Sequence, residues 1–138
     1  MRSYEIEIPF EVIPVQSARF RRFGNHISSY QPAKVINFKK QVAEYVAEDI
    51  KHETVPLFSK VPLEVRFLFY FKPPKTLRGN PVYKITRPDI DNCGKALQDA
   101  LTGILWEDDS LIAVRHSFKM YSDNPRIGIT VKCLDKAL

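Results

Sequence analysis

The sequence predicts a single α+β domain over residues 1–138, in which a mixed β-sheet carries two main helices. Three observations support this fold class. Segments with the period-two alternation of strands occur beside two segments with helical periodicity. The length of 138 residues suits one domain. The apolar fraction of 44%, with nine Phe and six Tyr, is sufficient for one hydrophobic core.

The first half of the chain predicts one strand and one helix. Residues 4–8 alternate polar and apolar side chains and end at a proline, which predicts a half-buried strand. A helix is predicted from Pro32 to about Lys51, because apolar residues recur there at three- and four-residue spacings. Pro32 suits the first helical turn, where a missing amide proton costs no hydrogen bond. The predicted core positions are Val35, Phe38, Val42, Tyr45, Val46 and Ile50.

Residues 10–30 show no clear period, so we expect a long loop between that strand and that helix. Basic and aromatic side chains alternate in Arg19-Phe-Arg-Arg-Phe23, as suits contacts with phosphates and stacking on unpaired bases. In the alternative interpretation, Phe20 and Phe23 anchor the loop on the core while the arginines are solvated. The sequence favours neither.

The second half predicts three strands and one helix. Residues 63–71 form an apolar run of strand length, expected to be a central strand, and residues 72–84 form a basic loop with three prolines. A helix is predicted from Asp89 or Asp91 to about Leu101, with Gly103 as its left-handed C-terminal residue. Strands at 110–121 and 126–133, joined by Ser122-Asp-Asn-Pro125, complete the order β-α-β-α-β-β.

The charge distribution indicates an anionic partner. The chain has a net charge of +5, yet much of its acid lies between Asp89 and Asp109. A polyanion attracted by the basic surface must tolerate this local group of carboxylates, and a divalent cation resolves that conflict. Two distant cysteines argue against a disulfide framework and a structural zinc site. Neither a signal peptide nor an apolar run of membrane-spanning length is present, so we expect a cytoplasmic protein.

The segment Asp89-Ile-Asp91-Asn92 is the strongest chemical signal. Two carboxylates that flank one residue, where an extended stretch meets a helix, can converge on one hard cation such as Mg²⁺. Asp109 supplies a third carboxylate, with Glu107 and Asp108 beside it. The competing interpretation needs no metal, because acids at a helix start are favoured by capping and by the helix dipole, and acids before a strand are ordinary turn residues.

Lys95 follows Asp91 by one helical turn and is therefore expected on the same face of the helix. A cation there stabilises the charge that develops on a reacting phosphate. Its alternative role is a simple ion pair with Asp91 or Asp99. Gly94 is a poor helix former, which indicates that another group approaches the helix backbone at this point.

Other catalytic classes find little support. His26, His52 and His116 share no metal-ligand spacing, and no Gly-x-Ser-x-Gly, P-loop or dinucleotide-binding motif is present. Cys93 lies in the first turn of a helix, where the pKa of a thiol can fall, but no histidine partner is indicated. A metal-dependent nuclease is the class that the residues favour.

Several of these residues together resemble the RusA family of Holliday junction resolvases, small endodeoxyribonucleases that are common in phages and prophages. The resemblance rests on Arg87-Pro-Asp-Ile-Asp-Asn, Lys95, Asp99-Ala-Leu-Thr-Gly103 and Trp106-Glu-Asp-Asp-Ser110. It covers about a third of the chain, roughly residues 87–114. Cys93-Gly94 depart from the pattern, since larger apolar or polar residues are usual there.

The resemblance implies a RusA-like fold and a homodimer that cuts four-way DNA junctions by paired nicking with Mg²⁺, for which Mn²⁺ can substitute. Asp89, Asp91 and Asp109 match the family's essential carboxylates, and Lys95 matches its essential lysine. We therefore expect metal ligation by Asp89, Asp91 and Asp109, catalysis by these three with Lys95, and a role in DNA recombination and repair. The basic residues expected to contact DNA are Arg19, Arg21, Arg22, Lys72, Lys75, Arg78, Lys84 and Arg87.

Two other functions are compatible with the sequence. A non-catalytic module for branched DNA would use the acids only for capping and solubility. A small metal-dependent nucleotide hydrolase would use the carboxylates but would leave the basic loops without a purpose. Nicking of a four-way junction separates the enzyme from the binding module.

Overall fold

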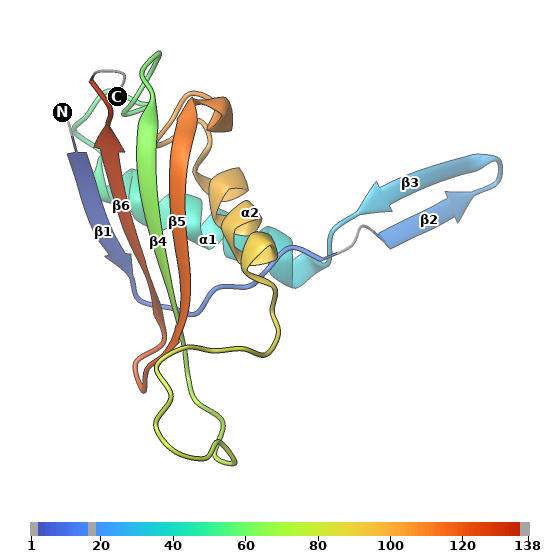
Figure 1. The fold of residues 1–138 in the computed structure, drawn as a ribbon. Coiled ribbons are helices and arrows are strands. Elements are labelled where there is room, and N and C mark those ends of the chain that lie inside the picture. The colour runs from blue at the N-terminus through green and yellow to red at the C-terminus, as the bar shows by residue number, and fades with distance from the viewer. Residues whose placement is uncertain (1–2, 17–18, 136–138) are drawn as a thin grey trace.

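The centre of the fold is a four-stranded mixed sheet in the order β1-β6-β4-β5 (Figure 1). The computed structural model describes residues 3–16 and 19–135. The strands are β1 (Ser3–Ile8), β4 (Leu63–Phe71), β5 (Ile112–Tyr121) and β6 (Arg126–Cys133). β6 pairs antiparallel with β1 and β4, whereas β4 and β5 are parallel. The mixed sheet is confirmed, and so is the interior position of the 63–71 strand.

Two helices, α1 (Ala33–Asp49) and α2 (Ile90–Leu101), cover one face of the sheet. Every second residue of β4, beginning at Leu63, is buried beneath them, because side chains alternate between the two faces of a strand. Phe67, Phe69 and Trp106 are among the largest fully buried residues. Burial of each such side chain contributes about 1.5–3 kcal/mol relative to exposure. The opposite face of the sheet stays open to solvent.

The expected loop at residues 10–30 is wrong for its second half. β2 (Arg19–Phe23) and β3 (His26–Tyr30) form an antiparallel hairpin that projects from the body of the protein (Figure 1). Gly24, with a φ of 57°, provides the left-handed residue of its two-residue turn. The hairpin lacks a periodic apolar pattern because it extends away from the sheet and helices. The side chains of Phe20 and Phe23 lie outside the described part, so the proposed anchoring is not tested.

Other elements agree closely with the sequence. The helix expected at 32–51 is observed as α1, and Val35, Phe38, Val42, Val46 and Ile50 are buried as predicted. Tyr45 is the exception: it is 41% exposed, and its ring meets Phe10 edge-on rather than entering the core. Gly103 adopts the predicted positive φ, at 91°, after Thr102 ends α2. No helix within the described ranges is both long and apolar enough to span a membrane.

Candidate active site

A cleft opens between the beginning of α2 and the strand β5. β5 presents polar side chains to it, because the parallel register places Ser117 opposite Phe67 and Lys119 opposite Phe69, on the helix-covered face. An otherwise apolar face thus becomes polar at the edge of the sheet. The residues that line the cleft are Tyr83, Lys84, Asp89, Ile90, Asp91, Asn92, Ser117, Phe118 and Lys119.

Asp89 and Asp91 reach this cleft from the start of α2. Asp89 precedes the helix with an extended backbone, at ψ 140°, and its side chain makes no capping hydrogen bond. Asp91 lies in the first turn, and its side chain is 87% exposed. Capping therefore does not account for Asp89, and both carboxylates are accessible from the cleft.

Lys119 fixes the segment that leads into Asp89. Its Nζ donates to the backbone carbonyls of Thr86 at 2.8 Å and Pro88 at 2.7 Å. Lys84 Nζ donates to the Thr86 hydroxyl at 2.7 Å. Two ammonium groups are thus held in the same cleft as the two carboxylates. Such an arrangement accepts a phosphate whose charge is shared between a metal and fixed cations.

Two more β5 residues face α2. Arg115 donates from Nη2 to Asp91 Oδ1 at 3.2 Å and from Nη1 to Gln98 Oε1 at 2.7 Å. The Ser117 hydroxyl oxygen is buried and has no hydrogen-bond partner among the described residues. A buried hydroxyl without a partner remains able to bond a molecule that enters the cleft.

Asp109 lies at the other end of α2. It begins the short 3₁₀ helix η1 (Asp109–Leu111), and Figure 1 shows η1 beside the C-terminal end of α2, far from its first turn. A helix of 12 residues is about 18 Å long. Across residues 3–16 and 19–135, no three His, Cys, Asp or Glu side chains form a group that could hold a metal ion. One protomer therefore does not bring Asp109 to Asp89 and Asp91.

Asp108 has a structural role. It precedes η1, and its carboxylate accepts a hydrogen bond from the Ser110 amide at 2.9 Å. Hydrogen bonds from Ser110 hold the pKa of Asp108 below its ordinary value. Asp108 therefore acts as a turn residue, which is the alternative considered for this acidic segment, while Asp109 is exposed.

Lys95 lies on the exposed side of α2, where its side chain is 66% exposed. Its Nζ is 3.9 Å from Asp99 Oδ2, and Lys39 Nζ of α1 is 3.3 Å from the same oxygen. Asp99 thus links the two helices. The ion pair anticipated as an alternative for Lys95 is formed with Asp99, while Asp91 pairs with Arg115.

The predicted DNA-contacting residues lie in two regions. Lys72, Lys75 and Arg78 are exposed in the loop after β4, and Arg22 is exposed in the hairpin. The side chains of Arg19 and Arg21 lie outside the described part. Arg87 lines a second hollow together with Asp89. Among the members of this set whose side chains are described, only Lys84 lines the cleft.

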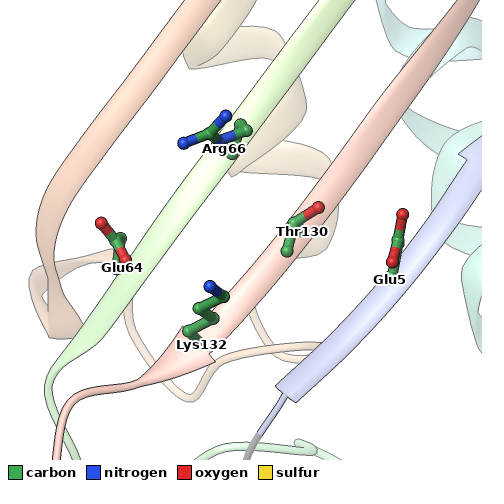
Figure 2. A pocket seen from close by; sticks show the side chains of 5 residues that line it. All are labelled: Glu5, Glu64, Arg66, Thr130 and Lys132. Carbon is green, nitrogen blue, oxygen red and sulfur yellow. The ribbon is translucent and has the colours of Figure 1, made fainter.

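The open face of the sheet carries a separate hollow, shown in Figure 2. Glu5, Glu64, Arg66, Thr130 and Lys132 line it from three strands. Glu64 Oε2 is 3.2 Å from His116 Nε2 of the neighbouring strand. Acids and bases alternate over this surface, so it offers neither a carboxylate pair for a metal nor a uniform field for a polyanion. Unlike this hollow, the cleft beside α2 has a pair of carboxylates next to two ammonium groups.

The two carboxylates of the cleft fit a hard divalent cation. Mg²⁺ usually keeps several waters and is held by one or two carboxylates together with substrate phosphates. Asp89 and Asp91 supply the two carboxylates, and the ammonium groups of Lys84 and Lys119 lie in the same cleft, where they can bind the phosphate. Cys93 is not a nucleophile, contrary to the lowered pKa considered above: it is fully buried, and burial raises the pKa of its thiol to about 11.

Arg115, Ser117 and Lys119 were not anticipated. The signal they offer is that these three polar residues occupy alternate positions within the strand Ile112–Tyr121. The alternation does not reveal which face is covered by the helices. That information depends on the parallel register with β4, a pairing between segments that are distant in the sequence.

Two comparisons relate the chain to known proteins. The family model described as "Endodeoxyribonuclease RusA" matches residues 9–132. A protein of Bacillus subtilis (strain 168), described as "Uncharacterized protein YqaN", is 31% identical over 111 residues. That similarity covers 73% of this chain and 75% of the Bacillus protein. The family match spans β4, α2, η1 and β5, and so includes every residue of the cleft.

Proposed function

Since this chain belongs to the RusA family of endodeoxyribonucleases, we propose that the cleft beside α2 cuts four-way DNA junctions by Mg²⁺-dependent paired nicking. The family consists of Holliday junction resolvases that hydrolyse phosphodiester bonds, so the enzyme class follows from membership. The metal, the residues that hold it, the dimer and the DNA contacts belong to the proposal. We assign the protein to DNA recombination and repair, in a phage or prophage setting.

One observation carries the assignment of the cleft. Asp89 and Asp91 both line it, and the Asp89 side chain is not used as a helix cap. Lys84 and Lys119 line the same cleft. Carboxylates and ammonium groups side by side are what a phosphodiester and a divalent cation together require.

The chain's own residues have distinct tasks in this proposal. Asp89 and Asp91 hold the cation, which when bound polarises the phosphate and lowers the pKa of a water molecule. Lys119 and Lys84 orient the phosphate and offset its charge. Lys95 retains its predicted catalytic role in this proposal. Its side chain lies on the exposed side of α2, outside the residues that line the cleft, so it would act on DNA that extends past the cleft. Mn²⁺ can replace Mg²⁺, because both accept oxygen ligands.

We propose that Asp109 acts across a homodimer. Within one protomer it lies at the far end of α2, so it can join Asp89 and Asp91 only from a second copy. A twofold axis that places the beginning of one α2 near the end of the other would create two such sites. Two symmetry-related sites suit the paired nicks that resolve a four-way junction.

Basic residues outside the cleft are proposed to position the DNA. Arg22 with its neighbours Arg19 and Arg21 belongs to the projecting hairpin, and Lys72, Lys75, Arg78 and Arg87 belong to the segment between β4 and α2. Contacts of this kind are made to phosphates and depend strongly on salt. They account for the basic character of a protein whose cleft is partly acidic.

The direct test compares three substrates: a synthetic four-way junction, a linear duplex of the same arms, and a nucleoside triphosphate. We expect symmetric nicks in the junction with Mg²⁺ or Mn²⁺ and little cleavage of the duplex or the nucleotide. Junction binding without nicks in either metal would instead indicate a DNA-binding module. Hydrolysis of the nucleotide alone would indicate a nucleotide hydrolase.

A further inference from the structure

The Arg115 guanidinium lies across one face of α2 and contacts three residues that are each about one helical turn apart. It donates to Asp91 Oδ1 at 3.2 Å and to Gln98 Oε1 at 2.7 Å. Between these two acceptors it lies against Gly94. Asp91, Gly94 and Gln98 follow at three- and four-residue spacings, and therefore share one face of the helix. A single side chain of β5 thus contacts three residues along the same face of α2.

Gly94 is the residue that admits this arrangement. A Cβ at this position would lie 2.7 Å from Arg115 Nη1, closer than two such atoms approach in proteins. Gly94 lies within α2, and its φ is not positive, so the backbone does not require glycine there. The close approach inferred from the sequence at Gly94 is therefore made by the guanidinium of Arg115.

Folding stability does not account for the arrangement. Glycine within a helix is destabilising relative to alanine. An ion pair whose acid is 87% exposed contributes little in return. An alanine at position 94, with the Arg115 side chain in solvent, would give a more stable fold. The contact is therefore best explained by what it does to Asp91.

We propose that Arg115, seated on Gly94, is a positioning residue for Asp91, and this rests on the proposed role of Asp91 as a metal ligand. Arg115 holds Oδ1 and leaves Oδ2 for the cation, which keeps an exposed carboxylate in one orientation. Both terminal nitrogens of the guanidinium are already bonded to α2, and its side chain is only 31% exposed. It is therefore placed to orient Asp91 rather than to contact the phosphate. Hydrogen bonds that orient a metal-binding carboxylate typically affect metal affinity or activity by about 10–100-fold.

Gly94→Ala gives the sharpest test, because it displaces the guanidinium without removing its charge. The atom that clashes is the end of a flexible side chain, so the variant is expected to fold, with a Tm equal to or above that of the wild type. We expect a nicking rate at saturating junction about tenfold lower than wild type. Mn²⁺ binding, measured by electron paramagnetic resonance without DNA, should weaken by about the same factor.

Arg115→Ala should reproduce both losses, and the double variant should be no worse than either single variant, because both changes remove one contact. Arg115→Lys should recover only part of the effect, since lysine keeps the charge but lacks the planar fork of donors that spans Asp91 and Gln98. Arg66→Ala is the matched control: Arg66 lies on the neighbouring strand but on the open face of the sheet, and should behave as wild type.

The proposal is overturned if Gly94→Ala retains nicking and Mn²⁺ affinity within about twofold of wild type, well short of the loss expected for an orienting contact. It is also overturned if the losses of the two single variants multiply in the double variant. Asp91→Asn in the same assays separates this inference from its premise. If Asp91→Asn loses both properties while Gly94→Ala loses neither, only the role of Arg115 is wrong. If Asp91→Asn loses neither, the assignment of Asp91 is wrong as well.

Discussion

At the scale of single residues, the sequence predicts the position of Asp89 and Asp91 but not the contacts that they make with distant residues. Their position at the start of α2 follows from local signals, because Asp is favoured at helix starts by capping and by the helix dipole. The partners of Asp91 come from β5, which no local pattern places beside α2. The carboxylate pair was therefore predictable, whereas its pairing with Arg115 was not.

Tyr4 offers a test of a single partly buried hydrogen bond. Its hydroxyl donates to Asp49 Oδ2 at 2.6 Å, which ties β1 to the end of α1. Tyr4→Phe leaves the carboxylate without this donor, so we expect a loss of about 1–2 kcal/mol in the free energy of unfolding at pH 7. Tyr45→Phe, on an exposed tyrosine of α1, is the matched control and should change little.

The same pair predicts a pH dependence. Burial, followed by the hydrogen bond to Asp49, raises the pKa of Tyr4 above its ordinary value. A tyrosine whose folded pKa is raised contributes full stability below the unfolded pKa of about 10, and loses it as pH rises further. The difference between wild type and Tyr4→Phe should therefore be constant from pH 7 to 9 and shrink above pH 10. Urea titrations that show a difference growing above pH 10 would contradict this assignment.

At the scale of elements, the sequence predicts best the helices and strands that bury one face, because burial imposes a periodic apolar pattern. The 63–71 strand was recovered with its bounds, because it is covered on one face by helices and its apolar residues alternate. The β2–β3 hairpin was missed, because it projects from the body and its sequence therefore carries no apolar period. The register between β4 and β5 could not be predicted from the sequence either. It joins segments separated by the whole of α2, and it decides which β5 side chains enter the cleft.

The hairpin is expected to serve binding rather than stability. Its base is closed by two hydrogen bonds, from the Gln16 amide to Gln31 Oε1 at 3.3 Å and from Gln31 Nε2 to the Gln16 carbonyl at 3.1 Å. Replacing residues 18–29 by a short Gly-Ser turn should leave Tm nearly unchanged. Junction affinity should fall about tenfold or more, with a shallower dependence on salt, because phosphate contacts are lost. A large loss of Tm with unchanged affinity would contradict a DNA-binding role for the arm.

At the scale of the whole molecule, the position of Asp109 means that the proposed site is complete only in a dimer. Mixing two inactive variants, Asp91→Asn and Asp109→Asn, tests this. If Asp109 acts across the interface, a mixed dimer contains one site with both native aspartates and recovers nicking of one strand. If Asp109 acts within its own protomer, each site of the mixed dimer lacks one aspartate and no activity returns. Recovery is measured after the two variants are co-folded, with each variant alone as the control.

The central claim is that Asp89 and Asp91 carry out metal-dependent cleavage in the cleft beside α2. Its most direct test is a titration of Mg²⁺ with Asp91→Asn and a synthetic four-way junction, following binding and nicking in the same samples. The amide keeps the size of the side chain but removes the charge that a hard cation requires. We predict junction binding within a few-fold of wild type and nicking lowered by at least about a thousandfold at every Mg²⁺ concentration, on the scale of losing a catalytic group. Asp91→Asn protein that nicks the junction at the wild-type rate would contradict the account.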